Sequence, residues 1–366
     1  ISAAVIMALG SASASAVDFH GYMRSGIGMN ASGGNQVCAQ ANGAPTKYRL
    51  GNECESYLEL GFNQELYNKG GKKFAVNTML AAKAGNGNDW QDTRDGISNV
   101  DGGNADNIPN GSPWGSTTLA FRQANVEATG LFGGNEVTWA GKKYYQRHDI
   151  HWMDLYYWNT SGLGAGVEQI SVGKAGAISA ALMREVDGDG ISSATNSDDH
   201  NVSVNNLDLR WAQIPMWSDA SLEVGVNYFM PSLTDNQDDA GTVNDDKAVM
   251  LTAEYTQGNF FGGFNKFVAQ YANNGAAGQL ISNHAGSGFW GGDQSERTSY
   301  RVIDWGTVSF TDKVEMGYVA LYANMDRGNE SSDDNTWFSI GVRPMYKWDQ
   351  VMKTVAEIGY DDADIW

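Results

Sequence analysis

One segment of the chain combines charged side chains with large aromatic rings. Residues 141–166 read GKKYYQRHDIHWMDLYYWNTSGLGAG. Planar rings stack on the apolar faces of sugars, while arginine and aspartate form paired hydrogen bonds with hydroxyl groups. A purely solvated loop has no need of so many rings, so we predict a loop that folds inward and lines a polar passage. Its charged and aromatic members are Arg147, His148, Asp149, His151, Asp154, Tyr144, Tyr145, Trp152, Tyr156, Tyr157 and Trp158.

The same segment allows other kinds of site, which the pattern supports less well. Two histidines and two aspartates could bind a metal ion, but their spacing fits no common metal motif, and on an extended chain some would face opposite sides. Asp149 and Asp154 could form a carboxylate pair for glycoside hydrolysis, yet nothing else in the chain supports it. A Ser/His/Asp arrangement stays open, although the chain has no Gly-x-Ser-x-Gly elbow. We predict no metal, no cofactor and no catalytic residue.

A second set of candidates lies near the start of the expected mature chain. Tyr22 and Arg24 are two residues apart, as are Tyr57 and Glu59, so on a strand each pair shares one face. A ring beside a charge would contact a sugar in two ways if that face lines a passage. The tyrosines would form part of an aromatic girdle if it meets lipid. The alternation of residues shows which side chains share a face but not which face is inside, so both alternatives stay open.

The elements that must position these residues are strands. Residues 56–63 place Leu58, Leu60 and Phe62 on one face, and residues 221–228 repeat the pattern. A period of two is typical of a strand with two different faces. About fifteen such segments predict a very large antiparallel sheet, which must close or fold on itself to hide its edges. Further strands are predicted at 73–83, 119–129, 136–145, 177–184, 206–214, 247–257, 263–273, 298–310, 314–325, 337–347 and 354–361.

Short and long connections alternate along the chain. Tight turns follow residues 68, 132 and 217, and long Gly/Asn/Asp-rich stretches cover 85–117, 185–205, 232–246 and 274–297. This alternation is typical of outer-membrane barrels with short periplasmic turns and long outer loops. Since no interdomain linker appears, we predict one all-β transmembrane barrel over residues 17–366.

The N-terminus and the charge place the protein in a compartment. Residues 1–16 resemble the second half of a signal peptide cleaved after Ala16, although a short apolar strand is the alternative. No other segment is apolar enough for a transmembrane helix. In an oxidising periplasm, Cys38 and Cys54 are expected to form a structural disulfide, worth about 3 kcal/mol for a loop of roughly this length. The net charge of −19 argues against nucleic acid as a partner.

Seven stretches match a known family. They are VDFHGYMRSGIG at 17–28, KYRLGNEC at 47–54, FRQANV at 121–126, WAGK at 139–142, YQRHD at 145–149, GFNKF at 263–267 and VRPMYKW at 342–348. With these motifs the chain resembles the maltoporins, a family of sugar porins, from residue 17 to about residue 360. The resemblance implies an 18-stranded homotrimeric barrel in the Gram-negative outer membrane, with about three C-terminal strands missing here. It implies facilitated diffusion of maltose and maltodextrins, contact with membrane lipid and lipopolysaccharide, and use as a phage receptor.

The resemblance also implies roles for individual residues. In that family a row of aromatic rings guides the sugar, and it corresponds here to Tyr22, Tyr57, Trp90 and Phe264. The polar residues that hydrogen-bond the sugar correspond to Arg24, Arg49, Glu59, Arg122, Arg147, Asp149, His151 and Asp154. The constriction tyrosine corresponds to Tyr156, and the loop disulfide of the family to Cys38 and Cys54.

The chain departs from the family at a few positions. Asn159 replaces the usual aspartate beside the inward loop, which is expected to weaken one negative contact near the constriction. Met23 replaces a small residue, on what is expected to be the outward face. The stretch between Trp90 and Arg122 is longer than usual. The alternatives are a general diffusion or other oligosaccharide porin, a barrel-type outer-membrane hydrolase, and a soluble lectin-like sandwich.

Overall fold

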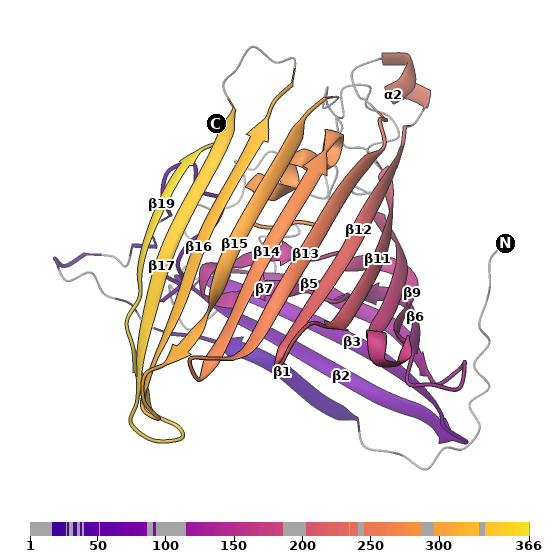
Figure 1. Ribbon diagram of the computed structural model, residues 1–366, viewed down its shortest axis with the longest axis horizontal. Coiled ribbons are helices and arrows are strands. Elements are labelled where there is room, and N and C mark those ends of the chain that lie inside the picture. The colour runs from indigo at the N-terminus through magenta and orange to yellow at the C-terminus, as the bar shows by residue number, and fades with distance from the viewer. Residues whose placement is uncertain are drawn as a thin grey trace.

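A single large sheet dominates the protein (Figure 1). The structure is a computed structural model that describes residues 17–26, 28, 32–34, 37–38, 40–50, 52–85, 91–92, 115–185, 203–233, 235–240, 245–286, 296–328 and 334–365. The predicted signal peptide lies outside the described residues. Within them, no helix combines the length and the apolar character needed to cross a membrane.

Apart from the short β4 (Gln91–Asp92), which pairs in parallel with β5, the sheet is antiparallel and follows the order of the chain. Of its 17 strands, β4 and β18 (Lys353–Val355) are short additions paired with β5 and β17. The other fifteen each pair with the next one along the chain, which confirms the predicted large antiparallel sheet. They are β1 (Asp18–Arg24), β2 (Glu55–Lys69), β3 (Lys72–Gly85), β5 (Gly115–Thr129), β6 (Val137–Lys143), β9 (Gly162–Ser171), β10 (Ala177–Glu185), β11 (Ser203–Pro215), β12 (Ala220–Ser232), β13 (Ala248–Phe260), β14 (Gly263–Asn273), β15 (Thr298–Ser309), β16 (Val314–Asp326), β17 (Asn335–Lys347) and β19 (Ile358–Asp364).

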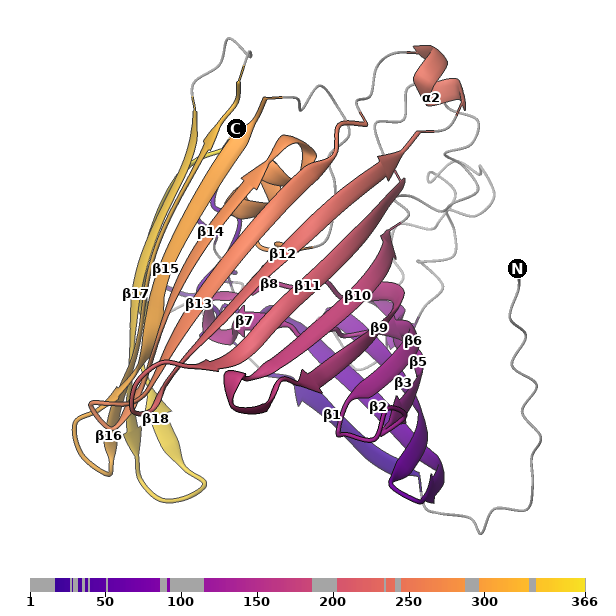
Figure 2. The same cartoon turned by 45° about the vertical axis from the view of Figure 1, so that its right-hand side comes forward.

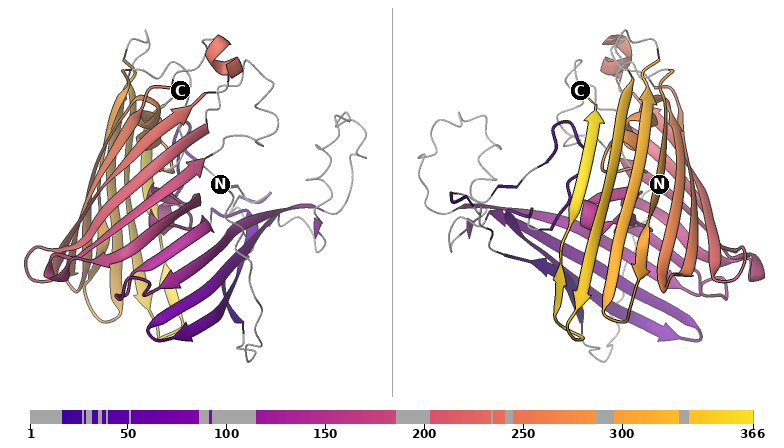
Figure 3. Two further views of the ribbon diagram at one scale, coloured as in Figure 1. Left: turned by 90° about the vertical axis from the view of Figure 1, so that its right-hand side faces the viewer. Right: turned by 60° about the vertical axis from the view of Figure 1, so that its left-hand side comes forward.

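The connections alternate in length as the sequence predicts. Two residues join β2 to β3 and two join β13 to β14, whereas η4 (Asn274–Ile281) and α2 (Asp235–Ala240) belong to long connections. A short 3-10 turn, η3 (Gly173–Ala175), joins β9 to β10. In Figure 1 the β17–β18 turn lies at the lower end of the sheet and α2 at the upper end. The edge strands β1 and β19 each have one neighbouring full strand among the described residues (Figure 3).

Two sequence boundaries need correction. The inward connector is shorter than the 141–166 predicted, because β6 continues to Lys143 and β9 begins at Gly162. Strand β19 continues past Asp361 to Asp364, since its acidic residues still pair with β17. Alternation tolerates acidic side chains wherever one face of a strand meets water, so charge alone did not mark the end of this strand.

The two faces of the sheet differ in what they expose. On the outer face, aromatic rings pair across strands: the rings of Phe19 and Phe62 lie 5.7 Å apart, and those of Phe338 and Tyr360 lie 6.4 Å apart. Met23 is also exposed, at 74 %, as expected for an outward residue. A wide apolar surface of this kind is stable only against another apolar phase.

Two connections fold onto the inner face of the sheet (Figure 2). Between β6 and β9 lie β7 (His148–Ile150), the 3-10 turn η2 (His151–Met153) and β8 (Leu155–Trp158). The second inward element is η4, between β14 and β15. Their apolar side chains form the largest buried cluster with residues of the inner wall, so packing fixes these loops in place. This confirms the predicted inward loop.

Glycines in the wall make room for the rings of the inward segments. A Cβ on Gly225 of β12 would lie 2.6 Å from the ring of Trp158. On β17 and β19, the paired Gly341 and Gly359 lie directly under the ring of Tyr48, and a Cβ on either glycine would overlap that ring. Each ring therefore lies flat against the backbone of the sheet.

Candidate functional site

Tyr22 of β1 and Tyr57 of β2 face inward. The rings of Tyr22 on β1 and Tyr57 on β2 lie 6.2 Å apart, and the Tyr22 ring is 5.8 Å from that of His151 in the inward loop. Since η2 lies inside the sheet, both tyrosines are on the inner face. The structure thus decides between the two faces that alternation left open.

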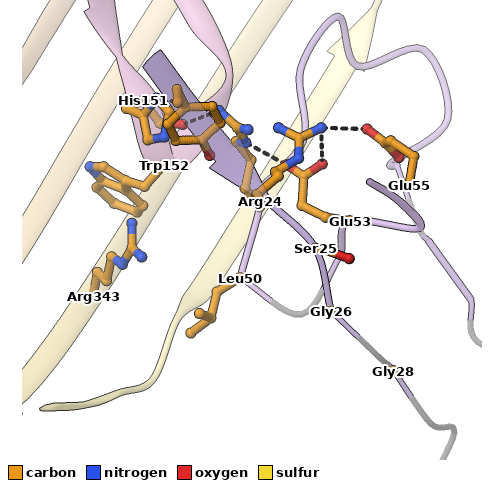
Figure 4. A pocket seen from close by; sticks show the side chains of 12 residues that line it. Arg24, Ser25, Gly26, Gly28, Leu50, Glu53, Glu55, His151, Trp152 and Arg343 are labelled. Carbon is orange, nitrogen blue, oxygen red and sulfur yellow. Dashed lines mark hydrogen bonds and ion pairs between the residues drawn. The ribbon is translucent and has the colours of Figure 1, made fainter. Parts of the chain in front are cut away.

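Arg24 lies beside these rings in a charged pocket (Figure 4). Its Nη2 atom is 2.7 Å from Glu53 and 2.5 Å from Glu55, and its guanidinium group lies 5.3 Å from the centre of the Tyr57 ring. The pocket has a volume of about 410 Å³ and is also lined by Arg343 of β17. Neither glutamate was among the predicted site residues. They offset the positive charge on this part of the inner wall.

Arg49 joins the β1–β2 connection to the inward loop. Its backbone N–H donates to the carbonyl of Trp152 at 3.0 Å, and Nη1 donates to the carbonyl of His151 at 3.1 Å. The same guanidinium pairs with Glu53 and lies 3.5 Å from Asp154. Cys38 and Cys54 form a disulfide that brackets this connection, as the sequence predicts. The disulfide limits the freedom of the segment that carries Arg49.

Glu59 is a common acceptor for two tyrosines. The hydroxyl of Tyr57 donates to Glu59 Oε1 at 2.7 Å, and that of Tyr144 donates to the same atom at 2.9 Å. Arg122 on β5 donates to the Tyr144 hydroxyl at 2.5 Å. The predicted residues Tyr57, Glu59 and Arg122 are therefore linked through Tyr144, which is the first residue after β6.

Arg147 lies between two rings of the inward loop. Its guanidinium carbon is 3.6 Å from the centre of the Tyr144 ring and 5.3 Å from that of Tyr156. At such distances the cation is attracted by the negative faces of both rings. Burial raises the pKa of Tyr156, so its hydroxyl stays neutral at physiological pH.

The remaining polar candidates surround η2. Asp149 Oδ2 lies 3.8 Å from Nδ1 of His151. Asp154 follows the turn in the left-handed region, at φ 55°, and from there faces Arg49. Burial and the charge of Arg49 lower the pKa of His151, so this ring is neutral above mildly acidic pH. These residues place donors and acceptors close to the Tyr22 ring.

Two members of the predicted aromatic row stand apart from this group. Phe264 of β14 is perpendicular to Trp305 of β15, with ring centres 5.2 Å apart. Lys266 lies 6.0 Å from the centre of the same Trp305 ring, which places Phe264 with the inward-facing residues of its strand. Trp90 lies outside the described residues.

Buried polar bonds hold the inward loop against the wall. The Trp158 indole donates to Asn227 at 3.0 Å, and the Thr160 hydroxyl donates to Asp208 at 2.7 Å. Arg210 pairs with Asp208 at 2.9 Å and covers the Trp158 ring at 3.8 Å. All of these wall side chains are buried. Because buried polar groups are costly to separate, the loop is held in one position.

Asn159 is buried in the turn that leads from the inward loop to β9. The residue is only 7 % exposed, and its Oδ1 accepts the backbone N–H of Ser161 at 3.2 Å. Its own N–H donates to the carbonyl of Ala285 at 2.5 Å. Asn159 therefore shapes the turn before β9, and the expected weakening of a negative contact near the constriction stays a prediction.

The predicted loop residues do not gather as a metal site. His148 faces the wall, whereas His151 faces Tyr22 on the other side of the loop. Within the described residues, the one group with suitable ligand atoms is His148, Glu223 and Glu254, all within 4.8 Å of one another. Both ring nitrogens already meet carboxylates, Nδ1 at 2.8 Å from Glu254 and Nε2 at 3.4 Å from Glu223. Burial lowers the pKa of His148, but the two carboxylates outweigh it and raise the pKa overall, which favours an ion-paired imidazolium over a metal ligand.

Besides Glu53 and Glu55, the sequence did not show the roles of Tyr144 and His284, which the structure brings to this site. Tyr144 was recognised only as one ring among many, although it joins Glu59, Arg122 and Arg147. His284 follows η4, and its ring stacks on Tyr156 with centres 4.9 Å apart. A single histidine in a Gly/Asn-rich connection gives no pattern from which this contact could be predicted.

Comparisons with known proteins agree with this architecture. The family model described as LamB porin matches residues 17–365. A maltoporin from Photobacterium profundum is 41 % identical over 353 residues, which cover 94 % of this chain and 78 % of that protein. A solved structure of Salmonella typhi OmpF in complex with daunomycin aligns with a TM-score of 0.54 at 10 % identity, over 95 % of this chain and 88 % of that one. That structural likeness concerns the fold alone.

Proposed function

Because the chain belongs to the LamB porin family, we propose that its inner face carries maltose and maltodextrins across the outer membrane down their concentration gradient. The chain is a sugar-selective outer-membrane porin and not an enzyme. The observation that supports the choice of sugar is the continuous set of inner-face rings and polar groups that runs from Tyr22 through Tyr57 and Tyr144 to Tyr156.

The rings supply the apolar half of the path. The pyranose faces of a maltodextrin are apolar, and an aromatic ring beside them excludes water from both. Each such contact is worth about 1 kcal/mol beyond the burial of area. Weak contacts repeated along a passage suit conduction, because a sugar must leave each site as readily as it enters. Phe264 and Trp305 extend the aromatic surface to another part of the inner face, on β14 and β15.

The polar groups supply the other half. Arg24, Arg122 and Arg147 offer donors to hydroxyl oxygens, while Glu59 and Asp149 offer acceptors. Their mutual contacts hold these side chains in place before a sugar arrives, so less conformational entropy is lost on binding. Paired donors and acceptors also distinguish this surface from a passage that is merely wide and charged.

The outer face supports the proposed partners. Phe19, Phe62 and Phe74 on the first strands are exposed and would be covered by lipid or by a neighbouring subunit of a homotrimer. Contact with lipopolysaccharide and use as a phage receptor are proposed from the family resemblance alone. Trp90 is proposed to reach the passage of a neighbouring subunit, as the family resemblance implies.

The test is the ion current of the full-length protein in a planar bilayer, with and without maltohexaose. A maltodextrin channel is expected to show a saturable block by the sugar. A general diffusion porin would conduct ions without such a block. A barrel-type hydrolase would cleave a glycan or lipid substrate, so product formation without a saturable sugar block would contradict the proposal.

A further inference from the structure

A second connection lines up beside the inward loop. The N–H of Tyr156 donates to the carbonyl of Asn283 at 2.8 Å, and the N–H of Ala285 donates back to the carbonyl of Tyr156 at 3.0 Å. These bonds form a parallel bridge between Tyr156 and His284. The segment that follows η4 thus acts as a short additional strand beside β8. In Figure 2, η4 lies on the inner side of β13 and β14, as this pairing requires.

Buried contacts fix the position of this segment. Gly286 donates its N–H to the Gln279 side chain at 2.7 Å, and its carbonyl accepts from Asn206 of β11 at 2.7 Å. Ala285 is fully buried in the main cluster. These contacts fix the backbone that directly follows His284. They therefore also limit where the ring of His284 can lie.

The His284 ring lies almost parallel to that of Tyr156. Their centres are 4.9 Å apart and their planes differ by 20°. Tyr156 is half-buried, whereas His284 is exposed on the inner side of the sheet. Two stacked rings from different connections therefore form one surface, next to the guanidinium group of Arg147.

The chemistry of the histidine differs from that of its neighbours. Its Nδ1 lies 3.0 Å from Oδ1 of Asn283, an acceptor, so Nδ1 carries the proton and Nε2 is the free acceptor. The charged groups that act on the ring are Asp154, Arg122 and Arg147. Although the ring is accessible to solvent, the protein atoms around it partly desolvate it, and together with the two arginines this outweighs Asp154 and lowers the pKa of His284, which keeps the ring neutral near pH 7. Because the nearby arginines are hydrogen-bond donors, the neutral Nε2 atom of His284 adds an acceptor to this surface.

We propose that His284 contacts the passing sugar at the constriction, extending the Tyr156 ring into a two-ring surface and accepting a hydrogen bond from a sugar hydroxyl through Nε2. This inference rests on the proposed maltodextrin path. It makes His284 a specificity-determining residue, because a linear sugar must pass the ring pair whereas small ions can pass beside it. Protonation of Nε2 would turn the acceptor into a donor and weaken sugar binding.

The test uses two variants of the full-length protein in planar bilayers with maltohexaose. His284→Ala removes the ring, and we expect the half-blocking concentration to rise about three- to tenfold, as expected for an aromatic contact. His284→Phe retains a ring but no nitrogen, and we expect a smaller rise. Phe132→Ala is the control, since the Phe132 ring is 74 % exposed in the turn between β5 and β6, and the half-blocking concentration should not change.

The pH dependence separates contact by the nitrogen from a purely structural role. As His284 takes up a proton towards pH 5, the block of the unsubstituted channel should weaken, and His151 and Glu53, whose pKa is raised by burial, contribute to the same range. His284→Phe should lose the part of this pH dependence that comes from His284. Any part that comes from His151 should remain. If either variant fails to assemble, heat-shifted mobility of the folded protein identifies it, and the other variant carries the test.

Two results would overturn the inference in different ways. If maltohexaose does not block the unsubstituted channel, the proposed function fails and this inference fails with it. If the unsubstituted channel is blocked and both variants match it in half-blocking concentration and pH dependence, only the role of His284 is wrong. A weaker block in His284→Ala with a flatter pH profile in His284→Phe supports both proposals.

Discussion

The guanidinium carbon of Arg147 lies 3.6 Å from the centre of the Tyr144 ring. The same carbon lies 5.3 Å from the centre of a second ring, that of Tyr156. A planar cation can stack closely on a ring, whereas the tetrahedral ammonium of lysine cannot. Arg147 is therefore held against the Tyr144 ring, next to Tyr156.

Arg147→Lys is expected to weaken maltohexaose block while retaining the cation. The stacking and the fork of donors are lost together, and a cation–π contact is worth roughly 0.5–2 kcal/mol, so the half-blocking concentration should rise about three- to thirtyfold. Block is measured as the titration of ion current with sugar. Arg184→Lys on β10, where the arginine donates to Asn205 at 3.2 Å, is the control. Equal block in both variants would mean that the stacked geometry of Arg147 is irrelevant to sugar.

Tyr156→Ala should enlarge the passage. Removing the ring takes away one wall of the constriction and the partner of His284, so single-channel ion conductance should rise. The sugar loses an aromatic contact, and the half-blocking concentration should rise roughly tenfold. Tyr156→Phe preserves the ring and should resemble the unsubstituted channel in conductance. An unchanged current and an unchanged block in Tyr156→Ala would remove this residue from the constriction.

Gly225→Ala tests whether the wall glycine positions the inward loop. Its new methyl group would lie 2.6 Å from the Trp158 ring, so the ring must move and the bond to Asn227 must stretch. Overpacking of this kind costs about 1–3 kcal/mol. The change is expected to lower the temperature at which the folded form disappears on gels and to shift tryptophan fluorescence. Gly317→Ala is the matched control, because its nearest neighbour is 3.6 Å away; similar effects in both would contradict a specific role for Gly225.

Much of the sheet could be predicted because alternation is a local property. Leu58, Leu60 and Phe62 identify one face of β2 without any knowledge of its partners, and β14 begins and ends at the predicted residues. Which face is inside could not be predicted in the same way, since it depends on where η2 lies relative to Tyr22. That contact joins residues more than a hundred positions apart in the chain.

The residues of the candidate site also differ in whether the sequence alone could predict them. Residues of the 141–166 segment stood out because rings and charges are adjacent in the sequence. Tyr144 and His284 gain their importance from the loops that bring them to Arg147 and Tyr156, and neither residue type nor spacing records that pairing. Glu53 and Glu55 were missed for a similar reason, because the sequence does not show that both lie within reach of Arg24.

The last prediction concerns the ion pairs that His148 makes with the wall. Its ring bridges Glu254 of β13 and Glu223 of β12, and Lys266 and Arg210 also contact these carboxylates. The pKa of His148 is raised in the folded protein, because the carboxylates outweigh burial. A raised histidine pKa stabilises the folded state fully below the unfolded pKa, about 6.5, and this contribution is lost as the pH rises through the folded pKa.

We therefore expect the folded barrel to lose thermal stability as the pH rises from about 6 towards 9, measured as the temperature of its mobility shift on gels. His148→Gln retains a hydrogen-bonding side chain without a charge, so this variant should be less stable at pH 6 and show a flatter profile. The lowered pKa values of His151 and His284 confine their titration to more acidic solutions. A profile of equal slope in His148→Gln would show that another group is responsible, and that the imidazolium does not hold the inward loop to the wall.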